Sequence, residues 1–139
     1  MMPLAFLMSA ILVVIAAIHL LWALGWWFPI RDEARLARAV VGARGITRMP
    51  GPVPTALVVV ALLFAAAWPW FPPGPGRKAG LVAIALVFQL RAVLAYAPPF
   101  QAATPEQPFR RLDERLYGPL CGALGIGYMM LAFAGTAAA

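Results

Sequence analysis

The sequence predicts an all-α integral membrane protein, a four-helix bundle with both chain ends on the non-cytoplasmic side. Three observations support this fold class: the composition, four long apolar runs, and the positions of the basic residues between them. Of the 139 residues, 63% are hydrophobic and 12% are charged. Soluble domains carry about 45–50% apolar and about 25% charged residues. We expect a single domain over residues 1–139, because four spans leave no room for a separate soluble unit.

Four apolar runs are long enough to cross a bilayer, which takes roughly 17–25 residues of helix. Backbone groups in lipid must form hydrogen bonds within their own segment, so these runs are predicted to be helices. The first run lacks a basic leader and is longer than a signal-peptide core, so it is expected to remain as a span. Clusters of proline separate the runs. The predicted spans cover about residues 4–28, 55–71, 79–97 and 116–137.

The basic residues of the loops predict the orientation. The first and third loops carry eight of them: Arg31, Arg35, Arg38, Arg44, Arg48, Arg110, Arg111 and Arg115. The second loop has only Arg77 and Lys78. The positive-inside rule therefore places the first and third loops in the cytoplasm, which gives an N-out/C-out, multi-pass protein of the bacterial inner (cytoplasmic) membrane. These eight arginines are most of the eleven basic residues that give the chain its net charge of +6. No nucleic-acid-binding motif accompanies them, so the expected partner is the lipid bilayer and not nucleic acid.

The first cytoplasmic loop has two interpretations. Asp32 is placed to cap a short amphipathic helix that reaches about Arg44 and lies in the membrane interface. Leu36, Val40 and Ala43 would then face lipid. A plain basic loop explains the same residues equally well.

Inserting a charged side chain at the centre of a membrane span costs roughly 2.5–3.5 kcal/mol on insertion scales. An ionisable residue within a span is therefore expected to have a structural or functional role. Arg91 lies in the third predicted span. It either snorkels to the cytoplasmic interface or faces inward as the partner of an anion or a carboxylate. His19, in the first span, is either a structural hydrogen-bonding group or an acid–base group. Trp22 lies one turn along on the same face.

The last span begins with three polar residues at helical spacing. Asp113, Tyr117 and Cys121 are predicted to share one stripe of the helix. Gly118 and Gly122 form a G-x-x-x-G pattern suited to close packing against another helix. Together with His19 and Arg91, the three polar residues fall in the cytoplasmic half of the predicted bundle, and this shared depth predicts a polar intramembrane pocket.

Three motifs resemble a family of small bacterial four-helix membrane proteins of unknown function. They are His19-x-x-Trp22-Ala23-x-Gly25, Phe88-x-x-Arg91-Ala92-Val93 and Phe109-x-x-x-Asp113-x-x-x-Tyr117-x-Pro119-Leu120-Cys121. The chain departs from the family at Trp26, where a glycine is expected, and at Gly118, where serine is usual. It also has Leu94–Ala95–Tyr96 in place of Gly-Asp-Phe. If the missing acid normally pairs with the arginine, Asp113 is the alternative partner of Arg91. The resemblance implies the fold and no activity.

Two functions from different classes remain open. In the first, the pocket binds an amphipathic or isoprenoid-like small molecule and isomerises or cyclises it by proton transfer. The catalytic candidates are His19 and Asp113 as the proton-transfer pair, Arg91 for an anionic or carbonyl oxygen, and Tyr117 for orientation. Trp22, Cys121 and Arg91 would contact the ligand. In the second, the chain is a non-catalytic accessory subunit of a larger membrane enzyme or transporter, or it forms a homo-oligomer.

No cofactor and no metal ion is predicted. The chain has one histidine and one cysteine, Cys121, which excludes an internal disulfide and makes a sparse set of metal ligands.

Overall fold

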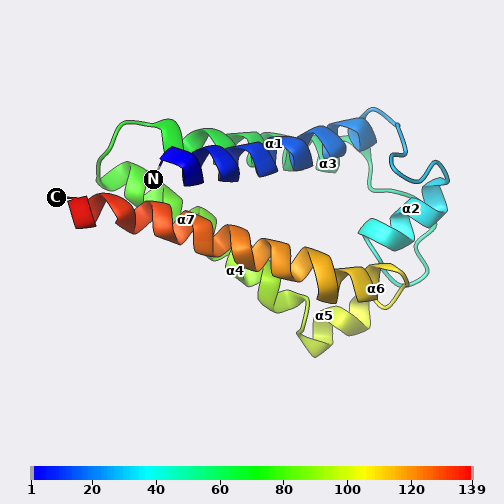
Figure 1. Cartoon of the computed structure of the whole chain (residues 1–139). Helices are drawn as coiled ribbons and strands as arrows, with labels where there is room; N and C mark the ends of the chain where they lie inside the picture. Colours follow the sequence, from blue (N-terminus) through cyan, green and yellow to red (C-terminus); the bar gives the residue numbers. More distant parts are fainter. Residues whose placement is uncertain (1, 139) are drawn as a thin grey trace.

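The computed structural model describes residues 2–138, and this part of the chain forms helices and no strand (Figure 1). Three stretches are long and apolar enough to cross a membrane by length and composition: Met2–Ala23, Pro52–Trp70 and Phe109–Ala134. These stretches indicate a membrane protein. The elements in chain order are α1 (Met2–Ala23), α2 (Glu33–Val40), α3 (Pro52–Ala67), η1 (Trp68–Trp70), α4 (Pro75–Leu94), α5 (Pro98–Ala103), α6 (Phe109–Leu112), η2 (Asp113–Tyr117) and α7 (Gly118–Ala138).

The four long helices form two pairs. Helix α1 packs mainly against α3, and α4 packs mainly against α7. The pairs converge at the end where both termini lie and diverge toward the end where α2 and α6 lie (Figure 1). The apolar core is built where they converge, from one or more side chains of every long helix, among them Leu12, Ala66, Leu81 and Leu124. The opposite end is therefore held by other interactions.

Helix α1 ends five residues before the predicted end of the first span. Gly25 has a φ of +83°, in the left-handed region that glycine adopts at helix ends. Its amide donates to the carbonyl of Trp22 (3.1 Å), and the amide of Trp26 donates to the carbonyl of Leu21 (2.8 Å). These two bonds form a Schellman motif, which stops the helix. Residues 24–31 are a loop and not the last turn of a span.

Helix α4 corresponds to the third predicted span, residues 79–97, but it begins earlier, at Pro75, and also ends earlier, at Leu94. It contains the charged residues Arg77, Lys78 and Arg91, and it is not among the three stretches named above. The last predicted span also begins earlier: α6, η2 and α7 follow one another without a break from Phe109.

The end of α3 is closed by side chains from other helices. A continuing α-helix would bond the carbonyl of Ala65 to the amide of residue 69, but Pro69 has no N–H. The buried hydroxyl of Tyr128, on α7, donates to the Ala65 carbonyl instead, at 2.7 Å. The Ser9 hydroxyl, on α1, donates to the next carbonyl, of Ala66, also at 2.7 Å. Each bond satisfies a backbone acceptor that lipid could not.

The first loop contains the predicted short helix, α2. The Asp32 carboxylate caps it by accepting from the Arg35 amide at 3.3 Å. The helix ends at Val40 and does not reach Arg44. Leu36 was expected to face lipid, but it is fully buried, because the apolar face of α2 packs against protein, mainly α6.

Candidate functional site

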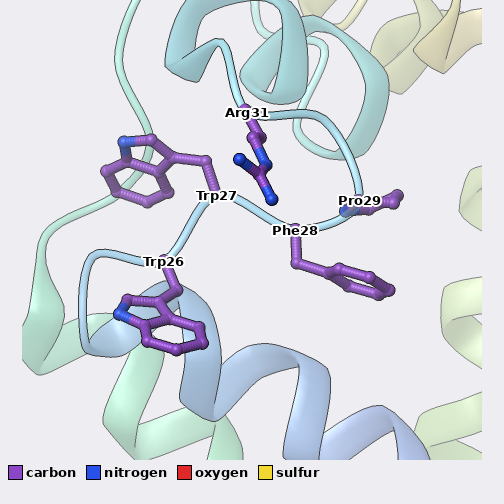
Figure 2. A pocket seen from close by; sticks show the side chains of 5 residues that line it. All are labelled: Trp26, Trp27, Phe28, Pro29 and Arg31. Atoms are coloured by element: carbon purple, nitrogen blue, oxygen red, sulfur yellow. The ribbon is translucent and has the colours of Figure 1, made fainter.

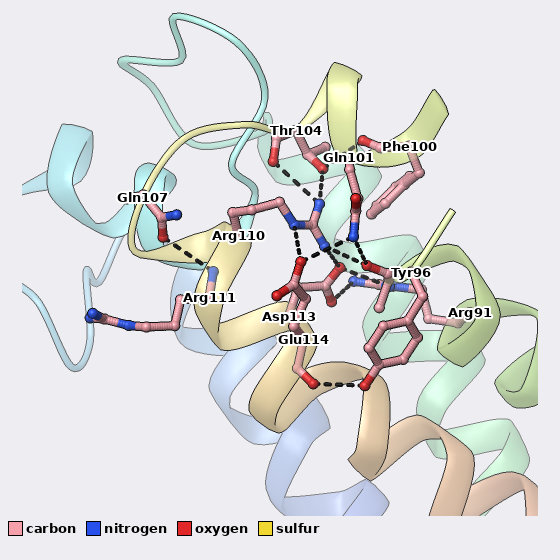
Figure 3. A network of polar contacts seen from close by, with 11 residues as sticks. Arg91, Tyr96, Phe100, Gln101, Thr104, Gln107, Arg110, Arg111, Asp113 and Glu114 are labelled. Carbon is pink, nitrogen blue, oxygen red and sulfur yellow. Dashed lines mark hydrogen bonds and ion pairs between the residues drawn. The ribbon is translucent and has the colours of Figure 1, made fainter. Parts of the chain in front are cut away.

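Three charged side chains form a buried ionic cluster where α4 meets the start of the last helix (Figure 3). Asp113 has no solvent exposure. One of its carboxylate oxygens accepts from Arg91 Nη2 at 2.7 Å, and the other accepts from Arg110 Nη2 at 2.8 Å. We call these three residues the Asp113 clasp. Arg91 therefore has the carboxylate partner that the sequence suggested as an alternative.

Arg110 links the clasp to the loop between α4 and α6. Its guanidinium also donates to the Ala95 carbonyl at 2.8 Å and to the Thr104 hydroxyl at 2.8 Å. Its side chain is only 11% exposed, whereas that of Arg91 is 32% exposed. Sequence analysis counted Arg110 only as a topology determinant. Its position three residues before Asp113, on the same helical face, was the signal that could have identified it.

A shell of weaker contacts surrounds the clasp. The Phe100 ring lies 5.1 Å from the Arg91 guanidinium carbon, close enough for a cation–π contact. Gln101 donates to both the Ala95 carbonyl and the Glu114 carboxylate, each at 3.0 Å (Figure 3). The cluster of Arg91, Arg110, Asp113 and Glu114 thus contains two positive and two negative charges. The charges are balanced within the chain, as expected of a structural element, although Arg110 Nε is buried and forms no hydrogen bond within the described residues.

The start of the last helix contains a π-helical turn, η2, from Asp113 to Tyr117. The amide of Gly118 donates to the Asp113 carbonyl five residues back. The wider turn changes the register, so Asp113 and Tyr117 do not contact the same neighbour. Asp113 is bonded to α4, whereas the Tyr117 hydroxyl donates to the Ala39 carbonyl of α2 at 2.9 Å. Tyr117 thus anchors the first loop, while Asp113 holds α4. π-Turns are frequent at functional sites.

The G-x-x-x-G pattern packs against α4 of the same chain. A Cβ placed on Gly118 would lie 2.8 Å from the Ala95 Cβ and 2.8 Å from the Asp113 carbonyl oxygen. A Cβ on Gly122 would lie 3.7 Å from the Ala92 Cβ. Close approach of the two helices is thus required at Gly118 and less strictly at Gly122. Cys121, between them, is a half-buried free thiol.

His19 lies in the other helix pair, beside a pocket of about 210 Å³. Its Nδ1 donates to the Ile15 carbonyl at 2.8 Å, since a carbonyl can only accept. The ring lies 4.7 Å from that of Trp22. The pocket lies between the end of α1, the end of α2 and the start of α3, and it is lined by His19, Trp22, Val40, Val41, Met49, Pro50, Pro54, Thr55 and Val58.

The structure thus separates the predicted site residues into two groups. Arg91 and Asp113 are bonded to each other, with Tyr117 nearby on the last helix. His19 and Trp22 line a different pocket, whose wall contains none of those three residues and not Cys121. Within residues 2–138 no group of three or more His, Cys, Asp and Glu side chains could hold a metal ion.

The fold and the two sites define a class: an all-α membrane protein with an ionic clasp at one end of its long helices. Within that class, the chain belongs to the family described as "Protein of unknown function (DUF3995)", whose model matches residues 12–128. The sequence-based assignment to a family of unknown function is confirmed. No curated protein and no solved structure matches the chain.

Proposed function

We propose that the chain is a four-span, N-out/C-out protein of the bacterial cytoplasmic membrane that binds an amphipathic small molecule in the His19 pocket. In this proposal α4 is the additional span. It has 20 residues and packs along α7, which is long and apolar enough to cross. The charges of Arg77 and Lys78 lie in its first turns, and Arg91, near its other end, is neutralised by Asp113.

The observation that carries the binding proposal is the orientation of the His19 ring. Nδ1 is engaged by the Ile15 carbonyl, so a neutral ring presents Nε2 as an unprotonated acceptor. Nε2 forms no hydrogen bond within residues 2–138 and is not among the atoms buried from solvent. His19 is the single titratable residue in a wall that is otherwise mainly apolar. A molecule with one hydroxyl on an apolar body matches this arrangement.

The proposal concerns binding and not proton transfer between His19 and Asp113. The two oxygens of the Asp113 carboxylate are occupied by the guanidinium groups of Arg91 and Arg110, and the residue lies in the other helix pair. As an accessory subunit, the chain would use the G-x-x-x-G face of its last helix to pack against a partner protein. Gly118 on that face is occupied by Ala95 of the same chain, and no other observation favours that alternative.

The test uses geraniol, a short isoprenoid alcohol, and the fact that the chain has one histidine. Protein labelled with ¹⁵N-histidine in nanodiscs is expected to give one pair of imidazole resonances, with the proton on Nδ1. Geraniol should shift the Nε2 resonance and leave that of Nδ1 nearly unchanged, because only Nε2 is free to accept. Val58→Trp, which fills the pocket, should abolish the shift. Val60→Trp, on an exposed face of the same helix, is the matched control and should preserve it.

An Nε2 resonance that does not respond to geraniol, or one that responds equally in the Val58→Trp variant, would contradict the binding proposal.

A further inference from the structure

A second hollow, of about 410 Å³, lies beside the loop that follows α1 (Figure 2). Its lining consists of consecutive or nearly consecutive residues: Trp26, Trp27, Phe28, Pro29 and Arg31. It shares no lining residue with the His19 pocket. Three aromatic rings and one guanidinium group are thus gathered by six consecutive residues of chain, 26–31, and neither the clasp nor the proposed function uses them.

The loop that builds this hollow is tied to α1 at two points. The Schellman motif at Gly25 fixes where the loop leaves α1. The indole of Trp22 then donates to the Phe28 carbonyl at 2.6 Å, which ties the middle of the loop back to the helix. A site built on such a loop is preorganised, so little ordering entropy opposes binding.

Arg31 is the cation of this hollow. Its guanidinium points into the space between Trp27 and Phe28 (Figure 2). The side chain is exposed, and within residues 2–138 it forms no hydrogen bond, ion pair or ring contact. It differs in this from Arg91 and Arg110, which form ion pairs with Asp113 and Glu114. Arg31 therefore retains an unmatched positive charge and a full set of donors.

The position of the hollow indicates the chemistry of its occupant. It begins three residues after the end of α1, which is long and apolar enough to cross a membrane. Trp26 and Phe28 are exposed there, and exposed aromatic side chains at span ends lie at the level of lipid headgroups. Phosphodiester groups occupy the same level. The planar fork of arginine matches phosphate oxygens with two parallel hydrogen bonds.

We propose that the Trp26–Arg31 hollow is a binding site for the headgroup of an anionic phospholipid, with Arg31 on the phosphate and the aromatic rings against the glycerol and upper acyl chains. The charge of the lipid matters because Arg31 has no ion-pair partner within the described residues and no carboxylate lines the hollow. The site is independent of the His19 pocket, and it requires only that α1 ends at a membrane surface.

The experiment is native mass spectrometry of the full chain, delipidated in detergent and titrated with phosphatidylglycerol, phosphatidylcholine or inorganic phosphate. The wild type is expected to retain one phosphatidylglycerol at a concentration well below that needed for phosphatidylcholine. Arg31→Gln should weaken this retention by about tenfold, the effect of losing one charge-assisted pair of hydrogen bonds. Arg35→Gln is the matched control, because Arg35 is exposed, lies on the same loop and does not line the hollow. It should change retention by less than about twofold.

Three outcomes would overturn the proposal. Equal losses in Arg31→Gln and Arg35→Gln would show general attraction to the basic loop. Equal retention of phosphatidylcholine would show that the net charge of the lipid is not recognised. Retention of inorganic phosphate with the same dependence on Arg31 would show an anion site that does not select a lipid. The Nε2 experiment on His19 is unaffected by all three, so the two proposals fail separately.

Discussion

The Asp113 carboxylate is stabilised by two guanidinium groups from different parts of the chain, one on α4 and one just before it on the last helix. Removing a charge from such a buried cluster leaves the remaining partners without compensation. The geometry supports a structural role for these residues more directly than a catalytic one, because each carboxylate oxygen already accepts a short hydrogen bond.

Asp113→Asn is therefore expected to destabilise the protein by about 3–5 kcal/mol, the range for breaking a buried ion pair. Glu114→Gln is the matched control. The Glu114 side chain is exposed, so this substitution should lower the free energy of unfolding by no more than about 1 kcal/mol. The measurement is chemical or thermal unfolding in detergent. Arg91→Gln should be less damaging in the Asp113→Asn background than in the wild type, since the two residues interact directly. Additive effects would contradict the pairing.

Sequence reasoning at this scale identified Arg91, Asp113 and their pairing, because an ionisable residue in an apolar run demands a partner. It did not identify Arg110, which resembles every other loop arginine until the chain folds. It grouped His19 with Asp113 from their similar depth along the predicted spans. Depth says nothing about which helices pair, so the separation of α1 from the α4–α7 pair was not predictable in this way.

At the scale of elements, the helices are shaped by single residues that lack a side chain or an N–H group. Gly25 ends α1, Gly118 permits both the π-turn and the approach of α4, and Pro69 ends α3. The predicted span ends were off by a few residues at these points, because apolar composition continues past the residue that stops the helix.

The two glycines of the G-x-x-x-G pattern are expected to respond oppositely to alanine. Gly118→Ala should destabilise the protein by about 1–3 kcal/mol, because its Cβ would lie within 2.8 Å of two atoms of the packed structure. Gly122→Ala should be neutral or stabilising by up to about 1 kcal/mol, since its Cβ would have ordinary contacts and alanine favours a helix. Unfolding of the two variants in parallel measures the difference. Equal effects would show that α4 and α7 do not approach as described.

The closure of α3 by Tyr128 predicts a compensating pair of substitutions. Tyr128→Phe should destabilise the protein by about 1–3 kcal/mol, because the buried carbonyl of Ala65 loses its donor. Pro69→Ala restores a backbone N–H four residues after Ala65 and should reduce that penalty in the double variant. Unfolding measurements on the four members of this cycle check the expectation. A Tyr128→Phe penalty that is the same with proline and with alanine at residue 69 would contradict it.

For the whole molecule, the all-α fold was predicted from the sequence, and three stretches have the length and composition of spans, but the arrangement of the long helices in two pairs was not predicted. The orientation and the crossing of α4 are proposals that one labelling experiment tests. Single cysteines replace Thr47, Gly76 and Gln107, all of them exposed, in a Cys121→Ser background. A membrane-impermeant maleimide added to intact cells should label position 76 alone, and positions 47 and 107 only after permeabilisation.

Labelling of positions 76 and 107 from the same side would show that α4 does not cross. Labelling of 47 and 107 in intact cells, with 76 protected, would reverse the orientation. Neither result would alter the helix pairs, which follow from packing and not from the bilayer.

The bond between Tyr128 and the Ala65 carbonyl also has a consequence for biogenesis. The chain enters the membrane from its N-terminus, so α1 and α3 are present before the last helix. The Ser9 hydroxyl is then already available to donate to the carbonyl of Ala66. The carbonyl of Ala65 has no side-chain donor until Tyr128, 63 residues later in the chain, has been synthesised. A chain that ends before Tyr128 therefore keeps an acceptor without its donor at Ala65, within an apolar stretch.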